Sequence, residues 1–276
     1  MKELLYGQST IAIVVVLFLC MLLFMELGCR LGRRRHVRES DAVRAHVGAI
    51  LTAMLGLLAL LLGFTFSLSL QRYDQRSQAI VMESNALRRV YLSAELLPRE
   101  LRNDVQALLR RYLDVRIREG RVSLADDSRR EVLDQQAREI ATELWARADS
   151  TVERDARPVS SGLFVQSLNE LIEASSVRHA SSARHVPEIV LLVMFAAFVL
   201  SGGTLGYAAG IAGHRPMPPA YAMVLLIVAV VYLIMDLDRP RRGVIRVSQE
   251  SLLELRQTMG TAEPPAARPD STRQAP

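Results

Sequence analysis

The chain has few of the residues that build covalent frameworks or metal sites. Among its 276 residues there are two cysteines, one tryptophan and a single lysine, Lys2. Cys20 and Cys29 are nine residues apart in or beside one apolar run, too far along a helix to bridge each other. A disulfide framework and a cysteine-rich zinc site are therefore excluded. The five histidines lack metal-ligand spacing, and neither a phosphate-binding loop nor a nucleophile elbow occurs. We predict no enzymatic activity, no cofactor and no bound metal.

Charge is nearly absent from four long stretches of the chain. Together they hold 89 residues and two charges, whereas the other 187 residues carry 61 of the 63 charges. Each stretch approaches the roughly 20 apolar residues that a helix needs to cross a bilayer. This partition excludes a soluble enzyme with one central core and predicts four transmembrane helices. The stretches are Ser9–Gly28, Val47–Leu70, Pro187–Ala212 and Met217–Met235.

The orientation in the membrane is indicated in two opposite ways. The first span is expected to be retained rather than cleaved, because Lys2 and Glu3 leave the segment before it without net charge.

A short arginine-rich loop follows the first span, and the positive-inside rule keeps such a loop cytoplasmic. Residues 71–186 and the C-terminal tail then lie outside the cytoplasm. Arginines that follow spans two and four favour the reverse, so the orientation stays open.

Helical periodicity extends beyond the spans, and alternation typical of strands occurs nowhere over a useful length. Ile80, Leu87, Tyr91 and Ala94 continue the helix of span two as far as Pro98. A second helix is predicted from Pro98 to Gly120 with an apolar side formed by Val105, Leu108, Leu109, Tyr112 and Val115. A third helix is predicted to begin at the capping sequence Ser123–Asp126, and its apolar side is formed by Val132, Ile140, Leu144 and Trp145. A fourth helix is predicted to run from Pro158 toward span three, with an apolar side formed by Leu163, Leu168, Leu171 and Ile172.

The predicted fold is an all-α integral membrane protein with four transmembrane helices and an extramembrane helical bundle between spans two and three. The predicted organisation is residues 1–46, the first span and arginine-rich loop; 47–98, the second span with its extension; 99–186, the helical domain; 187–236, spans three and four; 237–260, a membrane-exit segment; and 261–276, a disordered tail.

A stripe of small and hydroxylated residues follows one face of span two. Small residues let transmembrane helices pack closely, and they also leave room for water along a pore. Both interpretations stay open. The pore-lining candidates are Thr52, Gly56, Gly63, Phe64, Phe66, Ser67 and Ser69. In span three Gly202, Gly206 and Gly210 recur every fourth residue, which predicts tight helix contact.

Polar residues gather where spans two and four leave the bilayer. They suit an interfacial anchor or a buried network between helices or subunits, with a solvated face as the simpler alternative. The paired acids at the end of span four are too few for a calcium site by themselves. The candidates for this membrane-exit network are Arg72, Asp74, Glu83, Asn85, Asp236, Asp238 and Arg239.

These motifs together resemble the bacterial bestrophin-like proteins, and more distantly the bestrophin anion channels. The resemblance rests on Leu62–Ser69, Arg72–Asp74, Glu83–Asn85, Tyr91–Leu92, Leu96–Pro98, Asp236–Pro240 and Gly243. It implies four spans, a helical domain between spans two and three that faces the cytoplasm, and a pentamer whose second span lines the pore. The sequence departs from bestrophins in lacking a tryptophan-rich segment after span two and in having two aspartates where they carry a longer acidic cluster, so calcium gating is not carried over.

The sequence therefore predicts an oligomeric channel in a bacterial inner membrane, passing small anions through a pore lined by span two. The alternative is a membrane-anchored sensor or scaffold without transport activity. The expected partners are the lipid bilayer, other copies of the chain and small inorganic ions. A nucleic-acid partner is not expected, because basic and acidic residues alternate along the chain instead of forming one basic face.

Overall fold

The computed structural model describes residues 9–35, 41–122, 127–154, 158–183, 188–238 and 247–261. Within these ranges the chain is helical and forms no strand, which confirms the predicted fold class. The helices are α1 (Thr10–Arg35), α2 (Asp41–Ser93), a short 3-10 helix (Ala94–Leu96), α3 (Arg99–Arg121), α4 (Asp127–Arg154), α5 (Pro158–Ala183), α6 (Glu188–Ile211), α7 (Pro218–Asp238) and α8 (Glu250–Thr261). By length and composition α1, α2, α6 and α7 could each cross a membrane.

Several predicted features fall outside the described residues. They are the capping sequence Ser123–Asp126, the link between the fourth bundle helix and span three at residues 184–187, Arg239, Pro240 and Gly243, and the tail beyond Thr261.

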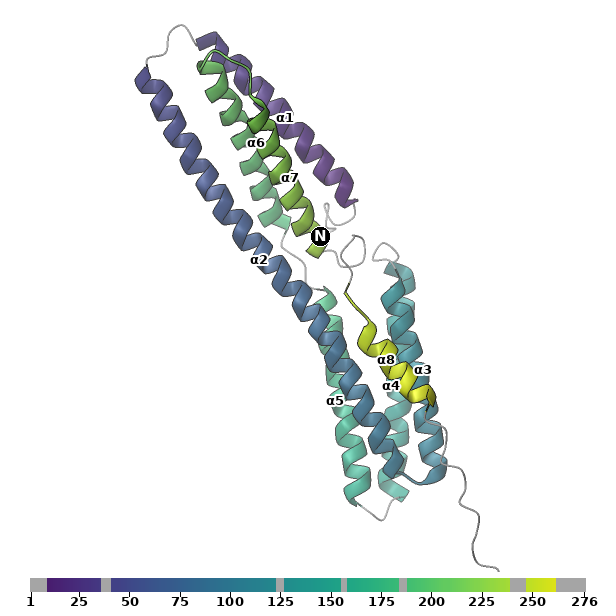
Figure 1. The fold of residues 1–276 in the computed structure, drawn as a ribbon. Coiled ribbons are helices and arrows are strands. Elements are labelled where there is room, and N and C mark those ends of the chain that lie inside the picture. The colour runs from purple at the N-terminus through teal and green to yellow at the C-terminus, as the bar shows by residue number, and fades with distance from the viewer. Residues whose placement is uncertain are drawn as a thin grey trace, which may run out of the picture. The chain divides into compact units, whose positions relative to one another are not determined.

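The described helices form two compact units (Figure 1). The first takes in Met1–Arg76 and Ser181–Val247, and therefore holds α1, the first part of α2, α6 and α7. The second takes in Ser77–Ala180 and Ser248–Pro276, with the rest of α2, α3, α4, most of α5 and α8. Helix α2 runs without interruption for 53 residues and contributes to both units.

Helices α1 and α6 pack in parallel through glycine. A methyl group added at Gly206 would overlap the carbonyl oxygen of Met25, and one at Gly210 would overlap that of Cys29. On α1, a methyl group at Gly28 would likewise overlap the backbone of Gly203. Only glycine permits this separation, because any Cβ would meet backbone that cannot move aside. The predicted tight contact along the glycines of span three is confirmed.

Helix α6 ends at a turn that requires glycine. Gly213 has a φ of 83° and donates its backbone N–H to the carbonyl of Gly210 at 3.0 Å. The N–H of His214 reaches back to the carbonyl of Ala209 at 3.3 Å. This left-handed cap satisfies the last carbonyls of α6 and reverses the chain into α7, which begins at Pro218.

The second unit is a helical bundle whose core follows the predicted stripes on α2 and α3. Ile80, Leu87, Tyr91 and Ala94 are all buried, so the extension of the span-two helix is confirmed. Pro98 stands at the N-terminal cap of α3, as predicted. The core positions of α3 are Val105, Leu109, Tyr112, Leu113 and Val115, with Leu108 half-buried.

The predicted apolar side of α4 was wrong in part. Val132 and Trp145 are exposed, with 56% and 42% of their surface accessible. Ile140 and Leu144 are buried, as predicted. The rest of the buried side consists of Leu133 and of two small residues that were not predicted, Ala137 and Ala148. On α5 Leu163 is likewise exposed.

Helix α8 belongs to the second unit, although its residues were predicted to form a membrane-exit segment and the start of a disordered tail. Leu252, Leu255 and Met259 are buried at helical spacing. The hydroxyl of Ser84 on α2 donates to the carbonyl of Ser251 at 2.9 Å, and the guanidinium of Arg110 on α3 donates to that of Met259 at 3.3 Å. These contacts fix the last described helix to the bundle.

Candidate functional site

In the first unit, α2 has a packed face and an opposite, uncovered face. Leu58, Thr65, Ser69 and Arg76 are buried and follow one another at steps of seven, four and seven residues, which places them on one side of the helix. Gly63 is two residues from Thr65 and therefore about 200° round the helix. A Cβ added at Gly63 would find nothing within 4 Å.

Most of the pore-lining candidates lie away from the packed face. Thr52, Gly56, Gly63 and Ser67 are exposed along one line, and Phe64 is beside them with 61% of its surface accessible. Phe66 is half-buried. The exception is Ser69, which is fully buried on the packed side and whose hydroxyl has no hydrogen-bond partner. The structure therefore brings Thr52, Gly56, Gly63, Phe64 and Ser67 to a side of α2 that the other described helices leave open.

Two arginines of α2 hold the end of α7. Arg76 is buried and donates to three backbone carbonyls, those of Ser181 at 3.3 Å, Leu237 at 3.4 Å and Asp238 at 3.1 Å. The last carbonyls of a helix lack partners within it, so these bonds satisfy the C-terminus of α7. The guanidinium of Arg72 lies 3.6 Å from the carboxylate of Asp238, an ion pair too long for a hydrogen bond.

In the second unit, the fully buried carboxylate of Glu83 is the centre of a charged network. It accepts hydrogen bonds from the hydroxyl of Tyr112 at 2.6 Å and from Nε of Arg116 at 2.8 Å. Its other oxygen accepts from Arg178. These donors come from α3 and α5, so one carboxylate on α2 joins three helices.

The two arginines extend the network to further carboxylates. Arg116 pairs with Glu119 at 2.9 Å and with Asp134 of α4 at 3.2 Å, and Arg178 donates to Glu119 at 3.4 Å. Arg116 also donates to the hydroxyl of Ser175. Buried charges are stable only when paired and hydrogen-bonded, and these conditions hold here.

Burial and neighbouring charges fix the protonation of this network. Burial raises the pKa of the Tyr112 phenol, and the Glu83 carboxylate raises it further. Burial by itself would lower the pKa of Arg116, but the oxygen of Tyr112 and the carboxylates of Glu83 and Glu119 outweigh it and raise that pKa. For Arg178 burial is likewise opposed and exceeded by Glu83 and Glu119, so its pKa is also raised. Tyr112 therefore stays a proton donor and both arginines stay charged.

The membrane-exit candidates separate into different environments. Arg72 and Asp238 meet in the first unit, where Asp236 is also buried. Glu83 belongs to the second unit. Asp74 and Asn85 are exposed. Arg239 lies outside the described residues.

Sequence reasoning missed the partners of Glu83, although a signal was present. Arg116 lies one turn after Tyr112, and Arg178 one turn after Ala174, each on the buried stripe of its own helix. Glu83 interrupts the stripe between Ile80 and Leu87 in the same way. One acid and two bases at core positions of three helices are complementary, and that combination predicts a buried network.

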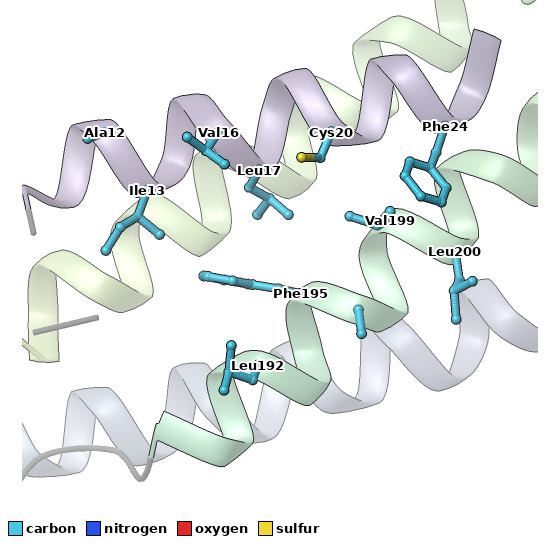
Figure 2. A pocket seen from close by; sticks show the side chains of 11 residues that line it. Ala12, Ile13, Val16, Leu17, Cys20, Phe24, Leu192, Phe195, Val199 and Leu200 are labelled. Atoms are coloured by element: carbon cyan, nitrogen blue, oxygen red, sulfur yellow. The ribbon is translucent and has the colours of Figure 1, made fainter. Parts of the chain in front are cut away.

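Metal ligands do not cluster in the described part of the chain, where no group of three or more histidine, cysteine or acidic side chains could hold an ion. Two grooves on the described helices of the first unit are apolar. The larger, of about 650 Å³, opens between the N-terminal halves of α1 and α6 and includes Cys20, Phe24 and Phe195 (Figure 2). It lies on the apolar part of both helices and extends as far as Phe24, next to Gly203 in the section where glycine brings the helices close.

Comparison with known proteins agrees with this architecture. The bestrophin-like domain matches residues 14–252. The chain belongs to the bestrophin-like family. Two crystal structures of variants of a bacterial bestrophin homologue from Klebsiella pneumoniae are similar in fold. The first is 15% identical with a TM-score of 0.65, and the match covers 95% of this chain and 99% of the homologue. The second is 14% identical with a TM-score of 0.65, and the match covers 89% of this chain and 97% of the homologue.

At these identities the similarity shows a shared fold, and the functional roles of the homologue's residues are not transferred to residues of this chain. A search of curated proteins gives no match. The bestrophin-like assignment confirms the resemblance drawn from the spaced motifs of the sequence, and the four apolar helices mark a membrane protein.

Proposed function

We propose that the chain forms an oligomeric bestrophin-type channel that passes small anions through a pore lined by α2. The observation that carries the proposal is the uncovered side of α2, on which Thr52, Gly56, Gly63 and Ser67 lie opposite the packed side. Copies of the chain arranged around a common axis would turn these sides toward one another and leave a water-filled space between them.

The line of small residues on α2 has no counterpart among the exposed residues of α1 and α7, although exposed aliphatic residues such as Leu57 and Leu60 flank it. Leu19 and Leu23 on α1 and Leu225 on α7 are exposed large aliphatic side chains, which suit the hydrocarbon of a bilayer. Glycine and hydroxyl residues gain little from lipid, but they allow close helix contact or a hydrated wall. No described residue packs against Gly56 or Gly63, so both uses need a helix from outside the protomer, and in an oligomer a second copy of α2 supplies it.

One observation favours a second candidate, a channel for cations. Asp74 is exposed and lies eleven residues after Gly63, three turns further along the same side of α2. In an oligomer it would form a ring of carboxylates, which selects cations. The anion proposal rests on the family resemblance, and the ion selectivity therefore needs a direct measurement.

Ion flux in liposomes tests the channel and its selectivity together. The purified full-length protein should carry chloride down a potassium chloride gradient, with a reversal potential set by chloride. A reversal potential set by potassium would overturn the anion assignment and support the second candidate, in which case Asp74→Asn should weaken selectivity. Flux equal to that of empty vesicles from an oligomeric preparation would refute a channel.

A matched pair of variants tests whether α2 lines the pore. Gly63→Trp places a large ring where the chain itself has nothing within 4 Å, so the protomer should fold and the flux should fall sharply. Leu225→Trp changes an exposed residue of α7 and should leave the flux unchanged. Equal effects would contradict a pore on α2. A monomer or dimer in detergent would instead favour the sensor or scaffold.

A further inference from the structure

A second apolar groove lies in the first unit between α2, α6 and the start of α7. Its volume is about 460 Å³, within the range of small-molecule sites. Leu55, Leu205 and Met223 line it together with the small side chain of Ala209. At its other end it is lined by His214 and Pro216, in the turn between α6 and α7. The groove therefore runs from the apolar interior of the spans to their ends.

Two contacts define the register of α2 against α6 beside this groove. Thr65 hydrogen-bonds to the sulfur of Met194 at 3.7 Å, and Thr204 to that of Met54 at 3.8 Å. Helices α2 and α6 are thus antiparallel, and their facing residue numbers have a constant sum. In this register the turn after Ile211 stands level with the first turns of α2, where Arg44 lies.

Arg44 is on the side of α2 that faces the groove. It precedes Leu55 by eleven residues, which is close to three helical turns and returns to the same side. Its side chain is exposed, and in α2 it tilts toward the helix N-terminus and away from the apolar interior. Arg215, between two residues that line the groove, is exposed at the same level.

Positive charge predominates at this end of the first unit. In the sequence of this end, residues 26–46 together with Arg215 hold seven arginines against three acids, and one of the acids, Glu26, pairs with Arg30 at 2.8 Å. The arginines whose side chains the structure describes are Arg30, Arg33, Arg34, Arg44 and Arg215. An apolar groove that opens at a cationic surface complements an amphiphile with an acyl chain and a negative headgroup.

We propose that the groove binds an anionic phospholipid, with an acyl chain against Leu55, Ala209 and Met223 and the phosphate held by Arg44 and Arg215. The described residues around the groove between α1 and α6 supply no such arginines, and the one charged residue of α6 is the acid Glu188. The phospholipid site is independent of whether the protein conducts ions.

Native mass spectrometry of the full-length protein in detergent tests the phospholipid site. Dioleoyl phosphatidylglycerol should bind more tightly than dioleoyl phosphatidylcholine, which has the same chains and no net charge. Arg44→Gln and Arg215→Gln should each weaken phosphatidylglycerol binding about fivefold. Arg34→Gln removes the same charge from the side of α1 turned away from Gly32 and α6, and it should leave the affinity unchanged. Equal affinity for both lipids, or equal effects of all three variants, would overturn the proposal.

A filling variant tests the acyl chain. Ala209→Phe should abolish phosphatidylglycerol binding, whereas Ala196→Phe, in the groove between α1 and α6, should retain it. If Ala209→Phe dissociates the oligomer and leaves lipid binding unchanged, the groove holds another copy of the chain and the proposal is wrong. Binding of glycerol phosphate as tightly as the lipid would also overturn it. The arginine variants, at exposed positions, keep the test available should Ala209→Phe not fold.

Discussion

Replacing Glu83 by glutamine should destabilise the helical bundle far more than the loss of one surface charge does. The amide keeps the size of the carboxylate and can still accept from Tyr112 and Arg116, but it removes the negative charge that faces Arg116 and Arg178. Both guanidiniums are almost fully buried, with 3% and 4% of their side-chain surface accessible. Breaking a buried ion pair costs about 3–5 kcal/mol, because the remaining charge cannot reach water. Glu119 still pairs with both arginines, so we expect about 3 kcal/mol.

Glu170→Gln is the matched control for this experiment. It makes the same change in the same unit, in the ion pair of Glu170 with Arg89 at 2.8 Å. Their side chains are 38% and 55% exposed, and an exposed pair contributes about 0–1 kcal/mol. Arg178→Met should cost less on the Glu83→Gln background than in the original protein, because the two residues interact directly.

The single tryptophan reports on the correct unit. Trp145 lies on α4, in the bundle that contains Glu83, so its emission during denaturant unfolding of the full-length protein in detergent follows the bundle and not the spans. Glu83→Gln should lower the midpoint strongly, and Glu170→Gln hardly at all. Equal midpoints for the two variants would refute the reasoning that the buried network stabilises the bundle.

Three further changes have defined outcomes. Gly206→Ala should disrupt α1–α6 packing and the folded elution peak in detergent, whereas Gly162→Ala on α5, with nothing within 4 Å of an added Cβ, should elute normally. Tyr112→Phe should cost about 1–3 kcal/mol in the Trp145-monitored unfolding, since it leaves Glu83 short of a donor. The contribution of Tyr112 is fully present below about pH 10 and falls as pH rises toward its raised pKa, so the variant should lack this alkaline loss. Arg76→Gln should lower thermal stability, followed by circular dichroism, by roughly 2–3 kcal/mol, and an unchanged transition would contradict its role at the end of α7.

The apolar spans could be predicted because each is a local property of about twenty consecutive residues. The continuation of α2 to Ser93 could be predicted for the same reason, since Ile80, Leu87 and Tyr91 keep one helical period. Helix α8 was missed, because three apolar residues in a short polar segment give a weak local pattern and its burial depends on contacts with distant helices.

The charged network could not be assembled from the sequence, because its partners are distant along the chain. Glu83 is 33 residues from Arg116 and 95 from Arg178. An arginine on a helix is usually solvated, and only the packing of α2, α3 and α5 decides which ones are buried. The two serines among the pore candidates were chosen for their small size and hydroxyl group, and these properties did not separate Ser69, on the packed side of α2, from Ser67 on the open side.

The parallel pairing of α1 and α6 sets an order for biosynthesis. Gly28 and Gly203, which meet in this interface, are about 175 residues apart in the chain. At roughly 5–20 residues per second, a ribosome needs on the order of 10–35 s to make the intervening polypeptide. During that interval α1 is in the membrane without the helix that its glycines fit. Among the four described spans α1 is therefore made first and packed late, and whatever contacts its glycine surface in the interval must leave when α6 arrives.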